Sequence, residues 1–177
     1  MVPFSTKGDD GSTSLLSGER VRKSGDREEA LGSLDEANSA MGLAKSLSFH
    51  RLTRDAIEWL QGKMFVLGAE VASRPERAKE LKERICASSV EEVSGKLQET
   101  ESLVAMPTEF SVPGANTPSA AVDMARAALR RAERRLVGLS DRGDIANPHI
   151  LAFVNRAADL LFVLARLEED REQERGV

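Results

Sequence analysis

The chain has 177 residues, with 25 lysines and arginines against 29 aspartates and glutamates, and a formal net charge of -4. A chain of this length most simply forms one domain with a core of its own. The net negative charge argues against general attraction to nucleic acid or to an anionic membrane. Cys86 is the single cysteine, and neither a leader-like apolar segment nor a membrane-spanning run is present, so we expect a cytoplasmic protein without disulfides.

The first predicted element is a long N-terminal loop over residues 1–25, because the apolar residues there follow neither a helical nor a strand period. Residues 5–14 read Ser-Thr-Lys-Gly-Asp-Asp-Gly-Ser-Thr-Ser. Glycines let backbone N–H groups approach phosphate oxygens, hydroxyls add donors, and Lys7 and Lys23 add charge. The spacing is not that of a Walker A loop. On its own the loop therefore indicates either a phosphate site or a flexible terminus.

Two helices are expected next. From about Asp26 to Ser48, apolar and small residues line one face at helical spacing. Thr53 is the expected cap of a second helix, which Pro75 ends. The charged stretch from Pro75 to Arg84 remains unassigned.

A third helix is predicted from the pair Ser89 and Glu92, which reads as a capping box, to about Met106. A non-helical connector follows over residues 110–116. Thr117 and Pro118 then form an N-cap and a first-turn proline for a fourth helix.

The last helix is expected at about 148–170, with Asn147 as its cap. It is apolar on nearly every side and should be the central, buried element. Its polar residues Asn155, Arg156 and Asp159 fall within one arc of roughly 100°. No strand is predicted, so the expected fold is all-α: a five-helix bundle in one domain, 1–177, with the loop at 1–25, the bundle at 26–170 and a tail at 171–177.

The fourth helix carries an unusual arginine run at residues 126–135. On a helical projection Arg126, Arg130 and Glu133 lie at the edge of the apolar arc, whereas Arg131 and Arg135 point the opposite way. A guanidinium beside a packed seam loses hydration and needs a carboxylate or a phosphate as acceptor. The pattern is therefore compatible with an anion site or with a structural ion pair. The two histidines have no cysteine or glutamate at ligand spacing, so neither a zinc nor a di-iron site is predicted.

The chain resembles the PduO-type ATP:cob(I)alamin adenosyltransferases, or corrinoid adenosyltransferases, over about residues 5–166. Besides the loop, the resemblance is carried by Glu-Ala-Leu-Gly-Ser-Leu-Asp-Glu-Ala-Asn-Ser at 29–39, Phe-Ser-Val-Pro-Gly at 110–114, the arginine run and Asn-Arg-Ala-Ala-Asp-Leu-Leu-Phe at 155–162. The most specific parts are Lys-Gly-Asp-Asp-Gly in the loop and Arg-Arg-Ala-Glu-Arg at 130–134.

The resemblance implies a cobalamin adenosyltransferase-like five-helix bundle that assembles as a homotrimer. ATP would lie between neighbouring subunits, held by the loop of one and the arginine helix of the other. Arg126 would pair with Asp35 across the interface, and Phe110 would lie beneath the corrin ring. The implied ATP-binding residues are Ser5, Thr6, Lys7, Gly8, Thr13, Ser14, Lys23, Arg130, Arg131, Ala132, Glu133, Arg134 and Asn155.

The implied reaction is attack of corrinoid Co(I) on C5' of ATP with loss of triphosphate. Lys23 and Arg130, with Mg²⁺, would stabilise the leaving group, and Arg126 and Asp35 would complete the catalytic set. The metal ligands are not predicted. An adenosylcobalamin-dependent mutase or a corrinoid reductase is the expected protein partner. Two other readings are a non-catalytic module that binds or delivers ATP or a corrinoid, and a structural adaptor whose arginine helix binds acidic partners.

Overall fold

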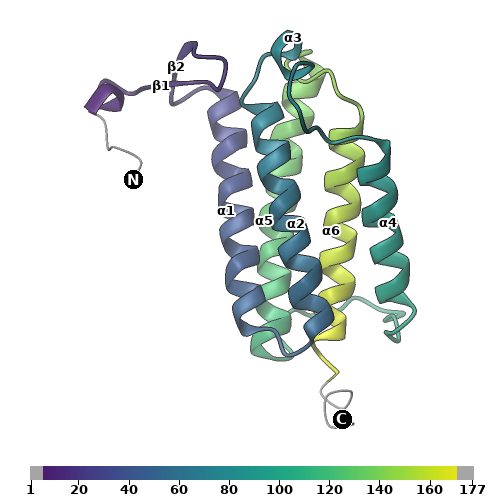
Figure 1. Cartoon of the computed structure of the whole chain (residues 1–177). Helices are drawn as coiled ribbons and strands as arrows, with labels where there is room; N and C mark the ends of the chain where they lie inside the picture. The colour runs from purple at the N-terminus through teal and green to yellow at the C-terminus, as the bar shows by residue number, and fades with distance from the viewer. Residues whose placement is uncertain (1–5, 171–177) are drawn as a thin grey trace.

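A computed structural model of the chain describes residues 6–170. Five helices run side by side, and the short α3 lies at one end of them (Figure 1). The elements are a 3-10 helix at Thr6–Gly8, strands β1 (Ser12–Ser14) and β2 (Arg20–Arg22), and helices α1 (Asp26–Leu47), α2 (Arg51–Val71), α3 (Pro75–Ala78), α4 (Ala87–Glu101), α5 (Thr117–Asp141) and α6 (His149–Leu167). The predicted all-α bundle is confirmed.

Helix α6 is the central element, as its apolar composition predicts. It packs against α5, α4 and α2, while α1 packs on α5 and α2. Phe153 and Leu160 of α6 are fully buried together with Leu129 and Leu136 of α5. Burial of each such side chain is worth roughly 1.5 to 3 kcal/mol, so the apolar arcs of α5 and α6 hold the arginine helix in a fixed orientation.

Strands β1 and β2 correct the prediction that the chain has no strands. They pair antiparallel, with Thr13 opposite Val21. Each strand has three residues, and β1 reads Ser-Thr-Ser, so neither is long enough for the alternation over four or more residues from which a strand is recognised. The expected long loop is thus a small hairpin that projects from the end of the bundle where α1 begins (Figure 1).

The predicted start of α2 was wrong. The helix begins at Arg51, and Thr53 is buried inside its first turn. No local side chain caps this end. Instead the buried carboxylate of Glu168, beyond the end of α6, accepts hydrogen bonds from the backbone N–H groups of Phe49 (2.8 Å) and His50 (3.3 Å). A residue more than 100 positions away therefore satisfies two backbone donors immediately before α2.

The starts of α4 and α5 also differ from the prediction. Cys86 is the N-cap of α4, and Ser89 is the third residue of its capping box rather than the cap. Helix α4 ends at Glu101 instead of Met106. Asn116 caps α5, because its side chain accepts a hydrogen bond from the N–H of Ser119 at 2.9 Å; Thr117 is already helical.

Helix α3 and the start of α6 complete the described elements. The unassigned stretch after Pro75 contains the single turn α3. The predicted cap of α6, Asn147, lies one position too early, because Pro148 is the N-cap and the helix begins at His149. The Asn147 side chain still accepts the N–H of His149 at 3.1 Å. Within residues 6–170 no helix is both long and apolar enough to cross a membrane.

Candidate functional site

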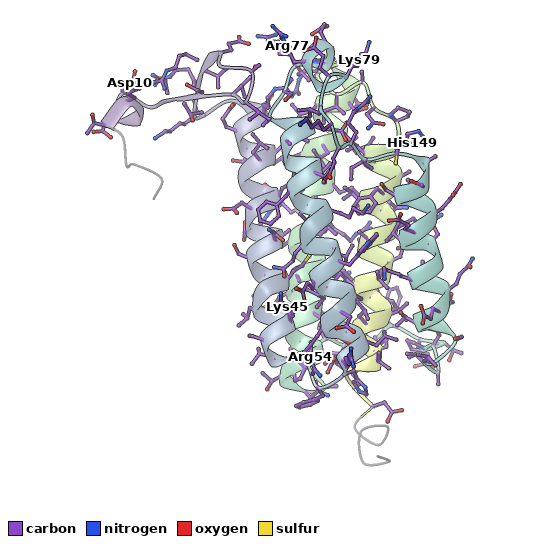
Figure 2. All side chains as sticks on the ribbon, in the orientation of Figure 1. Asp10, Lys45, Arg54, Arg77, Lys79 and His149 are labelled. Carbon is purple, nitrogen blue, oxygen red and sulfur yellow. The ribbon has the colours of Figure 1, made fainter. Side chains whose placement is uncertain are left out.

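The N-terminal hairpin is ordered by a short network around Asp10. The Asp10 carboxylate accepts hydrogen bonds from the N–H and the hydroxyl of Ser12, at 2.9 and 2.6 Å. These bonds, helped by Arg20, hold the pKa of Asp10 below its ordinary value. Arg20 also donates to the carbonyl of Lys7 at 2.6 Å, so the 3-10 turn is tied to the second strand. Figure 2 shows Asp10 on the segment that projects from the bundle.

Lys23, just after β2, lies beside the 3-10 turn that precedes β1. A Cβ built on Gly8 would come within 3.1 Å of the Lys23 Nζ. The backbone N–H of Lys23 donates to the carbonyl of Gly11 at 3.0 Å, and Gly11 has a φ of 76° that a side chain would strain. The structure therefore brings the predicted residues Lys23 and Gly8 together. Thr13 and Ser14 lie on the adjacent strand β1.

Two contacts fasten the hairpin to the bundle. The N–H of Leu16 donates to the carbonyl of Ala72 at the end of α2, at 3.1 Å. Arg74, just before α3, donates to the carboxylate of Glu19 in the turn of the hairpin. The predicted loop residue Ser5 lies outside the described residues, as does the predicted tail at 171–177.

The arginine helix forms one wall of a groove between α4, α5 and α6. The groove has a volume of about 290 Å³ and carries Arg126 and Arg130 on α5, and Asp159 on α6. Arg130 is half exposed, with Glu133 at 3.5 Å, and Arg134 donates to the carbonyl of Arg130 at 3.0 Å. The residues that line the groove are Leu97, Glu101, Met106, Arg126, Arg130, Ala158, Asp159, Phe162 and Val163.

Arg126 has an ion-pair partner in its own helix. Its Nε donates to Oδ1 of the buried Asp123 at 2.8 Å. Asp35 instead is exposed on α1 and lines a separate groove of about 310 Å³ between α1 and α2, whose apolar wall includes Phe65 and Leu16. The predicted pair of Arg126 with Asp35 across subunits stays a prediction, because the structure describes one chain.

The arginines on the far side of α5 have partners on α1. Arg131 pairs with Glu36, and Arg135 lies 3.3 Å from Glu29. These pairs join the α1 and α5 surfaces, as expected for residues that point away from the groove. Arg131 is thus turned from Arg126 and Arg130, and its predicted contact with ATP stays a prediction. Ala132 is fully buried in the core.

The remaining predicted residues lie apart from the hairpin. Asn155 is half-buried on α6, one position before Arg156, which pairs with Asp159 at 2.9 Å. Phe110 is fully exposed in the connector between α4 and α5. That connector lies at the end of the bundle opposite the hairpin (Figure 1). One chain therefore presents the predicted ATP loop and the predicted corrin contact at opposite ends.

Sequence reasoning missed Asp123 and Arg166. Asp123 accepts from Arg126 and, through Oδ2 at 2.6 Å, from Arg166 of α6. The available signals were the position of Asp123 one helical turn before Arg126 and the single charge of Arg166 within an apolar run. Among the described residues no group of three or more His, Cys, Asp or Glu side chains is placed to hold a metal ion.

Comparison with known proteins gives a consistent result. The family model described as cobalamin adenosyltransferase matches residues 4–168. A corrinoid adenosyltransferase of Citrobacter freundii is 32% identical over 166 residues, 94% of each chain. The corrinoid adenosyltransferase PduO of the same organism is 34% identical over 170 residues, which are 96% of this chain and 50% of that protein. The chain thus spans about half the length of the PduO proteins it matches.

Solved structures of similar fold include variants of a PduO-type ATP:corrinoid adenosyltransferase from Lactobacillus reuteri. A phenylalanine-to-alanine variant complexed with cobalamin and ATP has a TM-score of 0.81 at 29% identity, covering 92% of this chain and 91% of that one. An arginine-to-lysine variant complexed with ATP has a TM-score of 0.84 at 29% identity, covering 97% and 96%.

Proposed function

Because the chain belongs to the cobalamin adenosyltransferase family, we propose that it transfers the 5'-deoxyadenosyl group of ATP to Co(I) of a reduced corrinoid. In this reaction the two electrons of Co(I) form the Co–C bond while the bond from C5' to the phosphate oxygen breaks. The leaving triphosphate takes up negative charge. The products are the adenosylated corrinoid and triphosphate, and no acid, base or covalent nucleophile of the protein is required.

The observation that carries the proposal is the pair of basic sites that the fold builds. One is Lys23 beside Gly8 in the 3-10 turn before β1, and the other is the groove with Arg126 and Arg130. Lys23 and Arg130 are donors suited to the charge that develops on the triphosphate. Mg²⁺ would enter with the nucleotide, because it is usually held by phosphate oxygens with one or two carboxylates.

An active site shared between subunits accounts for the separation of the predicted residues. The hairpin and the Phe110 connector lie at opposite ends of the bundle, and the 22 residues of α1 alone span about 33 Å. One ATP and one corrin ring cannot bridge that distance. We therefore propose that the hairpin of one subunit meets the arginine groove and the connector of the next, in a homotrimer.

Phe110 is suited to contact the corrin ring because its side chain is fully exposed. An apolar ring beneath the corrin would exclude the lower axial ligand and make Co(II) easier to reduce. A corrinoid reductase and an adenosylcobalamin-dependent mutase are the partners that such chemistry needs, in the cytoplasm, for the supply of Co(I) and the use of the product.

An anaerobic assay with cob(I)alamin, ATP and Mg²⁺ tests the proposal. The expected result is the absorption change of Co–C bond formation with one triphosphate released per corrinoid. Binding of ATP by calorimetry without turnover would indicate the binding or delivery module instead. No ATP binding at all would leave only the structural adaptor. Light scattering at micromolar protein should give three times the 19.3 kDa of one chain, and a monomer would contradict the shared site.

A further inference from the structure

Asp123 of α5 and Arg166 of α6 form a buried ion pair that the proposed reaction does not use. Their side chains are 4% and 3% exposed, and Arg166 Nη2 lies 2.6 Å from Asp123 Oδ2. Desolvation offsets much of the attraction in such a pair, and apolar side chains of similar volume often serve stability as well. The charges are therefore not explained by the packing of α5 on α6.

The second carboxylate oxygen of Asp123 holds Arg126. Arg126 Nε donates to Asp123 Oδ1 at 2.8 Å, so each oxygen of one buried carboxylate binds a different arginine. Within residues 6–170 neither terminal nitrogen of Arg126 donates to a protein acceptor. Arg126 is therefore fixed through Nε of its guanidinium, and its two terminal nitrogens remain available on the wall of the groove.

Phe162 supports the same arrangement from α6. The Cζ atom of Arg126 lies 5.8 Å from the centre of the Phe162 ring, and that of Arg166 lies 5.1 Å from it. These distances are within the range of cation–π attraction. Phe162 lines the groove beside Arg126, whereas Arg166 does not line it. Arg166 thus holds Asp123 from the side that faces away from the groove. Asp123 and Phe162 together orient Arg126.

We propose that Asp123 is a positioning residue for the adenosyl transfer. It holds Nε of Arg126 so that the two terminal nitrogens face an anionic oxygen acceptor brought by the substrate or by the neighbouring subunit. This role rests on the proposed function, because the groove must be part of the active site. Preorganised donors of this kind contribute to rate because they need no reorientation when charge develops.

The test compares Asp123→Asn with Arg166→Gln in the full-length protein, with cob(I)alamin and ATP. In Asp123→Asn one carboxylate oxygen becomes an NH2 group, which cannot accept, so one of the two arginines loses its acceptor. Arg166 is buried and is also held by Glu169 at 2.8 Å, whereas the side chain of Arg126 is 26% exposed and can turn to solvent, so we expect Arg126 to be the one released. We expect Asp123→Asn to lower kcat/KM by roughly tenfold or more, the scale for a misplaced catalytic group, and Arg166→Gln to lower it by less than about threefold.

A double-mutant cycle distinguishes positioning from a general loss of structure. If Asp123 acts through Arg126, Asp123→Asn adds nothing to Arg126→Ala, and Arg126→Lys, which keeps the charge but lacks Nε, loses as much as Asp123→Asn. Equal losses in Asp123→Asn and Arg166→Gln, or independent effects of Asp123→Asn and Arg126→Ala, would overturn the role.

A second variant keeps the test valid if Asp123→Asn does not fold. Asp123→Leu combined with Arg166→Met replaces the buried pair by apolar side chains while Arg126 remains. Thermal unfolding should show a folded protein, and kcat/KM should again fall by about tenfold or more. Turnover within twofold of the parent would overturn the role of Asp123. A parent without turnover would instead overturn the proposed function on which it rests.

Discussion

Arg74 donates two hydrogen bonds to Glu19, from Nε to Oε2 at 2.6 Å and from Nη2 to Oε1 at 2.5 Å. This bidentate pair joins the turn of the hairpin to the segment between α2 and α3, 55 residues away. The bonds from Arg74 hold the pKa of Glu19 below its ordinary value. Because Gly8 and Lys23 flank the two strands of the hairpin, the pair of Arg74 and Glu19 fixes how this segment leaves the bundle.

The hairpin should therefore detach in acid. A carboxyl with a lowered folded-state pKa contributes stability above its unfolded pKa, and that contribution disappears as the pH falls through the folded value. We expect the amide of Leu16, which is bonded to Ala72, to lose protection below about pH 4, measured as its exchange rate relative to that of an unprotected amide at the same pH. At neutral pH Glu19→Gln should produce the same loss of protection.

The matched control is Glu80→Gln. Glu80 pairs with Arg77 at 2.9 Å and is also exposed, at 64% against 40% for Glu19, but no bond joins it to the described part of the hairpin. Its loss should leave exchange at Leu16 unchanged. Equal protection of Leu16 in the parent and in Glu19→Gln would mean that the pair does not hold the hairpin.

Lys23→Ala and Arg130→Ala should each weaken catalysis. Removal of one preorganised donor to a developing charge costs roughly 2 to 4 kcal/mol of transition-state stabilisation. The measurement is kcat/KM with cob(I)alamin and ATP. Arg135→Ala is the control, because Arg135 lies on the same helix but pairs with Glu29 on α1. If both site variants remain within twofold of the parent, the triphosphate lies elsewhere.

Phe110→Ala should separate corrin chemistry from ATP binding. Loss of the ring should leave ATP affinity unchanged in calorimetry, but it should let the lower ligand stay on Co(II). Turnover from Co(II) with a reductant should then fall more than turnover from Co(I) reduced beforehand. Val112→Ala, on the same exposed connector, is the control. Equal losses from the two oxidation states would contradict the assigned role.

The bundle could be predicted because its signals are local and repeated. Leu129 and Leu136 recur at helical spacing, and both are fully buried. The hairpin could not, because its strands have only three residues each and it is held by contacts between distant residues, such as Arg20 with the carbonyl of Lys7. The predicted cap at Thr53 was wrong for a related reason: the backbone donors before α2, at Phe49 and His50, bind Glu168, which is adjacent only in the folded chain.

The site was predictable to a similar extent. Helical geometry placed Arg126 at the edge of the apolar arc, and that position requires an anion but does not say which. In the structure Arg126 serves both alternatives, the structural ion pair and the anion site. Its Nε binds a carboxylate of its own chain, while its terminal nitrogens lie at the groove. The ion pair and the anion site are therefore parts of one arrangement, and only the position of Asp123 beside Arg166 reveals it.

The predicted contact of Asp35 with Arg126 across subunits can be tested by a mutant cycle. If the pair is partly dry in the assembly, Asp35→Asn should cost about 3 to 5 kcal/mol, the scale for breaking a buried ion pair; an exposed pair would cost at most about 1 kcal/mol. The loss should appear both as weaker association in light scattering and as lower kcat/KM. Asp35→Arg combined with Arg126→Asp should recover part of it, with a coupling of at least about 0.5 kcal/mol.

Glu36→Gln is the control, because Glu36 is the next residue of α1 but pairs with Arg131 in its own chain. Strictly additive effects at Asp35 and Arg126 would show that the two side chains do not meet.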